Sequence, residues 1–313
     1  MKPLMVRYGT FFASCALFVL FAVFAPNFLS VGNLTNIVKH ISFLAILALG
    51  FSLALTTAEL DLSFANVCSV ACVSVGWLVH TNHPLWMAVA AGLAVGLAAG
   101  LLNGILVTWV KVPSLIATLA TASIANGFAF MITQGVAFVG AWNQDFLWIG
   151  RGTLMGVPVL IVWLALLVLA AWFLLKFTPT GLRMLTVGQA DEAARLAGIP
   201  VRRIKLLGLA LSGLAAGIAA VLMTANLASA APNSAGDFML TSIAAVLLGM
   251  TMFEPGRPNV PGTLCGALTI GMLANGLVLM GAQYYVQDIA LGIIIVASVA
   301  VSSSFLKRAA LSI

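Results

Sequence analysis

Long apolar runs, separated by short polar segments, follow one another along almost the whole chain. Each run lasts about 20 residues, the length at which an α-helix crosses the hydrocarbon core of a bilayer. Polar and apolar residues do not alternate within the runs, as they would in the strands of a membrane β-barrel. The pattern predicts an all-α, polytopic transmembrane bundle of about ten spans, at 10–27, 36–57, 63–81, 85–109, 114–134, 157–176, 206–227, 238–252, 262–281 and 286–304.

Two places in this bundle are expected to hold short or broken helices. The run 238–252 is short for a span, and Glu59 and Asp61 interrupt the apolar sequence between the second and third runs. A helix fragment inside a membrane is tolerated only where protein or water satisfies its backbone, so we expect a half-helix or re-entrant element there. Residues 1–313 are otherwise predicted to form a single transmembrane domain.

Small residues recur at helical spacing and indicate close helix packing. Glycines stand four apart in the fourth run, and the same spacing returns in the seventh and ninth, at Gly92, Gly96, Gly100, Gly104, Gly213, Gly217, Gly262 and Gly266. The segments 100–107 and 271–278 also look alike, because each pairs Asn-Gly with a flanking glycine. This likeness favours an internal repeat, a common way to build transporters.

Composition and charge narrow the class of protein further. Of 313 residues, 62% are apolar and 7% charged, whereas about 25% are charged in an ordinary soluble domain. These values exclude a soluble globular protein, a disordered chain and a nucleic-acid-binding module. If the N-terminus is cytoplasmic, 12 of the 14 basic residues fall on cytoplasmic segments and only Lys39 and Arg151 lie outside. This bias follows the positive-inside rule and places both termini in the cytoplasm.

The spans contain uncharged polar side chains, and no acidic residue lies in the middle of a predicted span. Ser114, Thr118 and Thr121 are spaced to share one face of the fifth helix. One reading is hydrogen bonding between helices; the other is a path lined by neutral groups and suited to a polar, uncharged solute. The candidate path residues are Asn103, Ser114, Thr118, Thr121, Asn126 and Asn275.

The break between the second and third runs carries a second candidate group, Glu59, Asp61 and Ser63. Asp61 and Ser63 can cap the helix that follows, and capping alone would explain Asp61. The alternative is a structural or gating role in positioning the broken element.

The sequence offers neither a catalytic constellation nor a metal site. The four cysteines lie in apolar segments without accompanying His, Asp or Glu, and there is no His-Glu-x-x-His, Gly-x-Ser-x-Gly or phosphate-binding Gly-x-x-x-x-Gly-Lys-Ser/Thr motif. We therefore expect no catalytic residue and no cofactor bound by this chain; if ATP is used, another chain must bind it.

The segment from about 178 to 205 is the most polar stretch and is predicted to be cytoplasmic. Asp191 and Glu192 open a candidate short helix, Arg195 stands near its end, and Gly198 followed by Pro200 stops it. A helix of this length is marginal in water, so it should dock on something. The docking surface is either another protein or the chain's own membrane domain.

Several segments together resemble a known family. Gly-Gln-Ala-Asp-Glu-Ala-Ala-Arg-Leu-Ala-Gly-Ile-Pro-Val at 188–201 resembles the cytoplasmic Glu-Ala-Ala segment of the ribose/arabinose/galactose permease family of bacterial ATP-binding-cassette importers. The segments 61–63, 112–121, 211–217 and 261–268 are similar to that family as well. The resemblance departs at Glu59, where the family usually has glycine, and at 250–258, which replaces a glycine-richer loop.

The resemblance implies a permease with a fold similar to that of the vitamin B12 importer permease. It also implies a second permease chain, identical or different, a cassette ATPase that binds ATP and Mg²⁺, and a periplasmic solute-binding protein, all at a bacterial cytoplasmic membrane. The ATPase-coupling helix would carry Asp191, Glu192, Ala193, Ala194, Arg195 and Gly198. The leading hypothesis is the permease subunit of a monosaccharide importer. The alternatives are a secondary transporter or facilitator that works alone and, less favoured, an enzyme acting on lipid-linked substrates.

Overall fold

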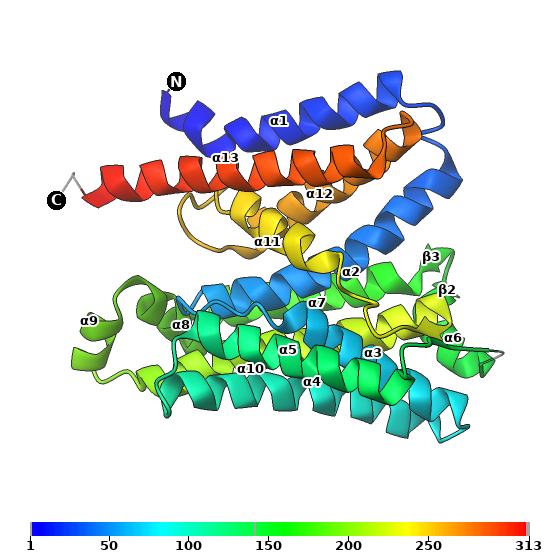
Figure 1. Ribbon diagram of the computed structural model, residues 1–313. Helices are drawn as coiled ribbons and strands as arrows, with labels where there is room; N and C mark the ends of the chain where they lie inside the picture. The colour runs from blue at the N-terminus through cyan, green and yellow to red at the C-terminus, as the bar shows by residue number, and fades with distance from the viewer. Residues whose placement is uncertain (1, 141, 311–313) are drawn as a thin grey trace. The chain divides into compact units, whose positions relative to one another are not determined.

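The computed structural model describes residues 2–140 and 142–310, and the surroundings of the side chains over 10–140, 142–283 and 285–298. Within these ranges the chain is mainly helical (Figure 1). The helices are α1 (Lys2–Phe24), α2 (Val31–Leu55), α3 (Phe64–His80), α4 (Leu85–Thr108), α5 (Ser114–Thr133), α6 (Gln144–Arg151), α7 (Val159–Phe177), α8 (Pro179–Gln189), α9 (Asp191–Leu196), α10 (Val201–Leu227), α11 (Phe238–Gly249), α12 (Val260–Leu279) and α13 (Tyr284–Ala310).

Four two-residue strands form two antiparallel ribbons between the helices. β1 (Phe138–Val139) pairs with β4 (Ser229–Ala230), and β2 (Thr153–Leu154) pairs with β3 (Val157–Pro158). The prediction of an all-α fold is confirmed, since these ribbons only tie loops together.

Among the described residues, six helices are long and apolar enough to cross a membrane: α2, α4, α5, α7, α10 and α12. Shorter apolar stretches lie in α1, α3, α11 and α13. Each of the ten predicted runs therefore falls on one of these ten helices. The predicted short run is the 12-residue α11, and the predicted break is the segment 56–63 between α2 and α3.

The pattern of apolar runs did not predict the amphipathic helices α6 and α8. The structure also starts α10 at Val201, whereas the predicted run begins at residue 206. The first five residues of α10 include Arg202, Arg203 and Lys205. A hydropathy pattern detects only the apolar part of a helix and does not include a polar turn at its end. The predicted start of this helix was therefore wrong by about one and a half turns.

The helices group into two compact units, one of Met1–Ala48 with Leu240–Ile313 and one of Leu49–Met239. We call them the terminal unit and the central unit. In the terminal unit α1 packs on α12, where the Thr269 hydroxyl donates to Ser14 Oγ at 2.8 Å and the Phe21 ring covers Gly276. Asn33 on α2 and Asn275 on α12 exchange two hydrogen bonds, of 3.0 and 2.8 Å.

The core of the central unit is the crossing of α4 and α10, with α3 packed on both. Gly96 on α4 faces Gly213 and Gly217 on α10, and a methyl group on either Gly96 or Gly213 would overlap the other's carbonyl oxygen. The glycine stripes predicted from sequence therefore meet one another. Their missing side chains let the two backbones touch, the arrangement that replaces hydrophobic burial as the packing force inside lipid.

Candidate functional site

The helices α8 and α9 form a short arm held on the central unit by its own small core. Thr178 caps α8 by accepting from the Gly181 backbone N–H at 3.1 Å, with Pro179 in the first turn. The arm is fixed by a cluster of buried apolar side chains from α2, α8, α9 and α10, namely Leu53, Met184, Val187, Ala194 and Ile204. The predicted short helix around 191–198 is confirmed as α9.

The outer face of α9 is uncovered in this chain. Glu192 and Arg195 form an ion pair and their side chains are mostly exposed. Leu196 beside them is 84% exposed. The helix ends at Leu196, and Gly198 two residues later has φ of +78° and would meet no atom within 4 Å if it carried a Cβ. Glycine is therefore required there by the left-handed backbone and not by lack of space.

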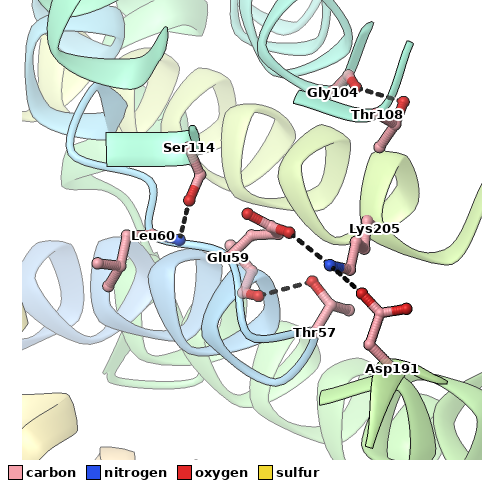
Figure 2. A network of polar contacts seen from close by, with 9 residues as sticks. Thr57, Glu59, Leu60, Gly104, Thr108, Ser114, Asp191 and Lys205 are labelled. Carbon is pink, nitrogen blue, oxygen red and sulfur yellow. Dashed lines mark hydrogen bonds and ion pairs between the residues drawn. The ribbon is translucent and has the colours of Figure 1, made fainter. Parts of the chain in front are cut away.

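The inner end of α9 joins a charged contact that sequence reasoning missed (Figure 2). Lys205 Nζ, on the first turns of α10, lies 2.7 Å from Asp191 Oδ2 and 2.9 Å from Glu59 Oε1. The Glu59 side chain is only 9% exposed, the Lys205 side chain 19% and the Asp191 side chain 53%. A carboxylate buried this far would be strongly destabilising without its cation.

The loop that carries Glu59 is wedged between α8 and α10. Gly188 of α8 lies against the carbonyl oxygen of Thr56, and Gly208 of α10 lies against the Thr57 side chain, so a Cβ at either position would clash. Ala58 has φ of +60°, which turns the chain away from α2 toward Glu59. Packing on both sides thus fixes where the Glu59 carboxylate can be.

The same loop is bonded to two side chains of α5. The Leu60 N–H donates to Ser114 Oγ at 3.3 Å, and the Leu62 N–H donates to Thr118 Oγ1 at 3.1 Å. The Thr118 hydroxyl lies 3.2 Å from the carbonyl oxygen of Leu60 and 2.8 Å from that of Ser114. Two of the candidate path residues therefore hold the loop onto the beginning of α5.

Three more predicted residues form a buried chain of hydrogen bonds behind the loop. Asn103 Nδ2 donates to Ser63 Oγ at 2.8 Å, and the Ser63 hydroxyl and N–H both donate to Asp61 Oδ1, at 2.6 and 2.9 Å. Ser63 precedes α3, but its hydroxyl makes no cap bond to that helix. Asp61 stabilises the turn before α3 instead, because its carboxylate accepts a hydrogen bond from the Ser63 N–H.

This buried chain is incompletely satisfied. Asn103 Oδ1 has no hydrogen-bond partner among the described residues. Burial raises the pKa of the Asp61 carboxyl above its ordinary 3.8, and the hydrogen bonds from Ser63 offset only part of that effect.

The remaining path candidates take no part in the hydrogen bonds described above. Thr121 is buried and Asn126 half-buried, both farther along α5. Asn275 belongs to the terminal unit, where it helps to line a cavity of about 370 Å³ together with Asn36, His40 and Gln287. The structure thus brings together Glu59, Asp61, Ser63, Asn103, Ser114, Thr118 and Asp191, and adds Lys205.

No metal-binding cluster of His, Cys, Asp and Glu occurs among the residues described. The polar contacts described above fix the loop 56–63 against α5, α9 and α10. They place no nucleophile beside a base.

Comparison with known proteins gives consistent matches over most of the chain. A family described as branched-chain amino acid transport system / permease component matches residues 33–299. The ribose import permease RbsC of Bacillus subtilis (strain 168) is 34% identical over 94% of this chain and 92% of its own length. The L-arabinose transport system permease AraH of Escherichia coli (strain K12) is 34% identical over 94% and 89%.

Among solved structures, a metal-chelate type ABC transporter in an inward-facing conformation matches 97% of this chain and 99% of its own, with a TM-score of 0.52 and 12% identity. At that identity the match concerns the fold alone. It agrees with the expected polytopic permease architecture.

Proposed function

The chain belongs to the permease family matched over residues 33–299, and on that premise we propose that it is the membrane permease subunit of an ATP-binding-cassette importer for a monosaccharide. The relatives that support this solute class are named for ribose and arabinose import. The proposed function makes no covalent change in the solute; the chain provides the route and couples it to a partner that hydrolyses ATP.

The observation that carries the proposal is the arm formed by α8 and α9. Its inner side is fixed to the central unit by buried apolar contacts, while Glu192, Arg195 and Leu196 project from it. A short helix that is rigid at its base and exposed at its tip suits docking in a groove of a cassette ATPase. Asp191–Arg195 with Gly198 would form that contact, and the arm would lie in the cytoplasm with both termini.

We assign the solute route to the side of the central unit that carries α5. No residue of α5 is charged, and its polar side chains are hydroxyls and one amide. Such groups exchange hydrogen bonds with sugar hydroxyls without the cost of desolvating a charge. Ser114, Thr118, Thr121, Asn126 and Asn103 are then the candidate residues of the route, and Asn275 stays a prediction from the sequence.

The complete importer in this proposal contains two permease chains, ATPase subunits carrying ATP and Mg²⁺, and a periplasmic binding protein, in a bacterial cytoplasmic membrane. ATP binding would favour one arrangement of the permease and hydrolysis the other, through contacts that differ between the two states.

The test is uptake of radiolabelled ribose, arabinose and galactose into liposomes that contain the permease, its ATPase and the binding protein. Uptake should require all three components and ATP, and an ATPase variant unable to hydrolyse ATP serves as the control. Uptake by the permease chain alone would contradict the proposal, as would labelling of a cysteine at position 196 from outside the cell.

A further inference from the structure

Building on the proposed function, we infer that Lys205 is a positioning residue that ties the ATPase-coupling helix α9 to the loop 56–63 and, through that loop, to the solute-route helix α5. We call the contact between Asp191, Lys205 and Glu59 the lysine link. It joins three segments that are far apart in the sequence, and Figure 2 shows the Lys205 ammonium between the two carboxylates.

The two halves of the lysine link differ in burial. Lys205 and Glu59 are 19% and 9% exposed, so water and salt hardly screen their attraction. Asp191 is 53% exposed, and its half of the link is the weaker one. Asp191 can therefore be neutralised without leaving a buried charge, and the link can be tested in a folded protein.

Motion of the Glu59 carboxylate cannot be absorbed by the loop that carries it. Thr56 and Thr57 are pressed against the glycines of α8 and α10, and the next residue after Glu59 is bonded to Ser114. Thr118 holds the loop on both sides of Asp61, through the Leu60 carbonyl and the Leu62 N–H. A displacement at α9 is therefore passed by Lys205 into the loop and from there into the first two turns of α5.

The burial of Glu59 supports a specific role for its partner. An acidic side chain at this buried position would be costly without a cation. Lys205 supplies that partner and also reaches Asp191 on the coupling helix. Neutralising the buried Glu59 carboxylate requires only the Lys205–Glu59 pair. The additional contact with Asp191 connects this pair to α9.

The experiment measures solute imported per ATP hydrolysed in the reconstituted importer. Asp191→Asn and Lys205→Met should each lower this ratio on the order of tenfold, within the usual range for coupling between sites. ATP hydrolysis should continue. The double variant should be no worse than Lys205→Met alone, because both changes break one link. Lys205→Arg, which keeps the charge and reach, should restore most of the ratio.

Arg203→Gln is the matched control, since Arg203 is an exposed cation two residues away on the same helix. It should leave the ratio at the wild-type value. If Lys205→Met does not fold, Lys205→Met combined with Glu59→Gln, which leaves no buried charge, takes its place and should lower the ratio equally. A wild-type ratio in Asp191→Asn, or losses that add in the double variant, would overturn the inference. Failure of the wild-type importer to take up any sugar would instead refute the proposed function.

Discussion

The middle and the beginning of α10 are held by two different kinds of contact. In the middle, Gly213 and Gly217 lie on the backbone of α4, with no side chain between the helices. At the beginning, Lys205 lies between two carboxylates, one buried and one half-exposed. Backbone packing is lost as soon as the surfaces separate, whereas an ion pair keeps its attraction over several ångströms. One helix can therefore be a fixed part of the central unit along its length and a connection to the coupling arm at its end.

The largest effect should come from filling the glycine contact. Gly213→Val would drive a side chain into the carbonyl of Gly96 and the backbone of Gly100. Overpacking against backbone that cannot move should destabilise the protein by more than about 3 kcal/mol. Thermal unfolding in detergent, followed by size-exclusion chromatography, measures this. Gly127→Ala is the control, because a Cβ there meets nothing within 4 Å, and it should melt like the wild type or slightly higher. A folded, wild-type-like Gly213→Val would show that the crossing is looser than described.

The next effect should come from removing the cation at the beginning of α10. Lys205→Met leaves the Glu59 carboxylate buried and unpaired, so the free energy of unfolding should fall by about 3 kcal/mol. Adding Glu59→Gln should recover most of this loss, because no buried charge then remains. Asp191→Asn should cost less than about 1 kcal/mol, since that carboxylate is half-exposed. Equal losses in Lys205→Met and Asp191→Asn would contradict the assigned difference between the two halves.

Asp61 should respond to substitution according to its protonation. Its pKa is raised by burial, so ionising it in the folded protein opposes folding. Its favourable contribution is complete below pH 3.8 and is lost as the pH rises through its folded pKa. Asp61→Asn mimics the neutral acid and should be at least as stable as the wild type at pH 7.

The wild type should gain stability relative to Asp61→Asn as the pH falls from 7 toward 3.8, and melting curves over this range measure the difference. Asp61→Ala should lose about 1–3 kcal/mol throughout this range, because the Ser63 N–H and hydroxyl lose their acceptor. A stability difference between Asp61→Asn and the wild type that does not change with pH would refute the protonation argument.

A moderate effect is expected just beyond the end of α9. Gly198→Ala should cost about 1–2 kcal/mol, from the left-handed backbone alone. Gly198→Asn should cost less, because asparagine tolerates this conformation better. Differential melting of the two variants measures the contrast, and a larger loss for asparagine would indicate a steric contact that the described residues do not contain.

Sequence patterns located the helices well and their contacts poorly. Apolar runs predict where α2, α4, α5 and α12 lie because lipid demands about 20 apolar residues per span. The glycine spacing predicted close packing, and α9 was predicted from its charges and the Gly198-Ile199-Pro200 stop. These signals are local, so the sequence itself contains them.

The candidate site depended on contacts between distant segments. From the sequence, Lys205 was only one of several basic residues on a cytoplasmic segment. It lies 146 residues after Glu59, and no local pattern indicates that the two side chains are in contact. Thr118 and Asn103 suggested either a solute path or bonding within the protein, and their contacts lie on the loop 60–63. The sequence signal for this contact was Glu59, an acidic residue that interrupts the apolar sequence. An acidic side chain that becomes buried requires a cation as its partner.

The most direct test of the whole account is a distance measurement between spin labels placed at the exposed positions 196 on α9 and 60 on the loop, in a background where Cys15 and Cys265 are serine. A second pair, at 102 on α4 and 203 on α10, reports on the glycine-packed crossing. In the reconstituted importer both distance distributions should be narrow. Lys205→Met should broaden the 196–60 distribution and leave the 102–203 distribution unchanged. A 196–60 distribution that stays as narrow without Lys205 as with it would contradict the account.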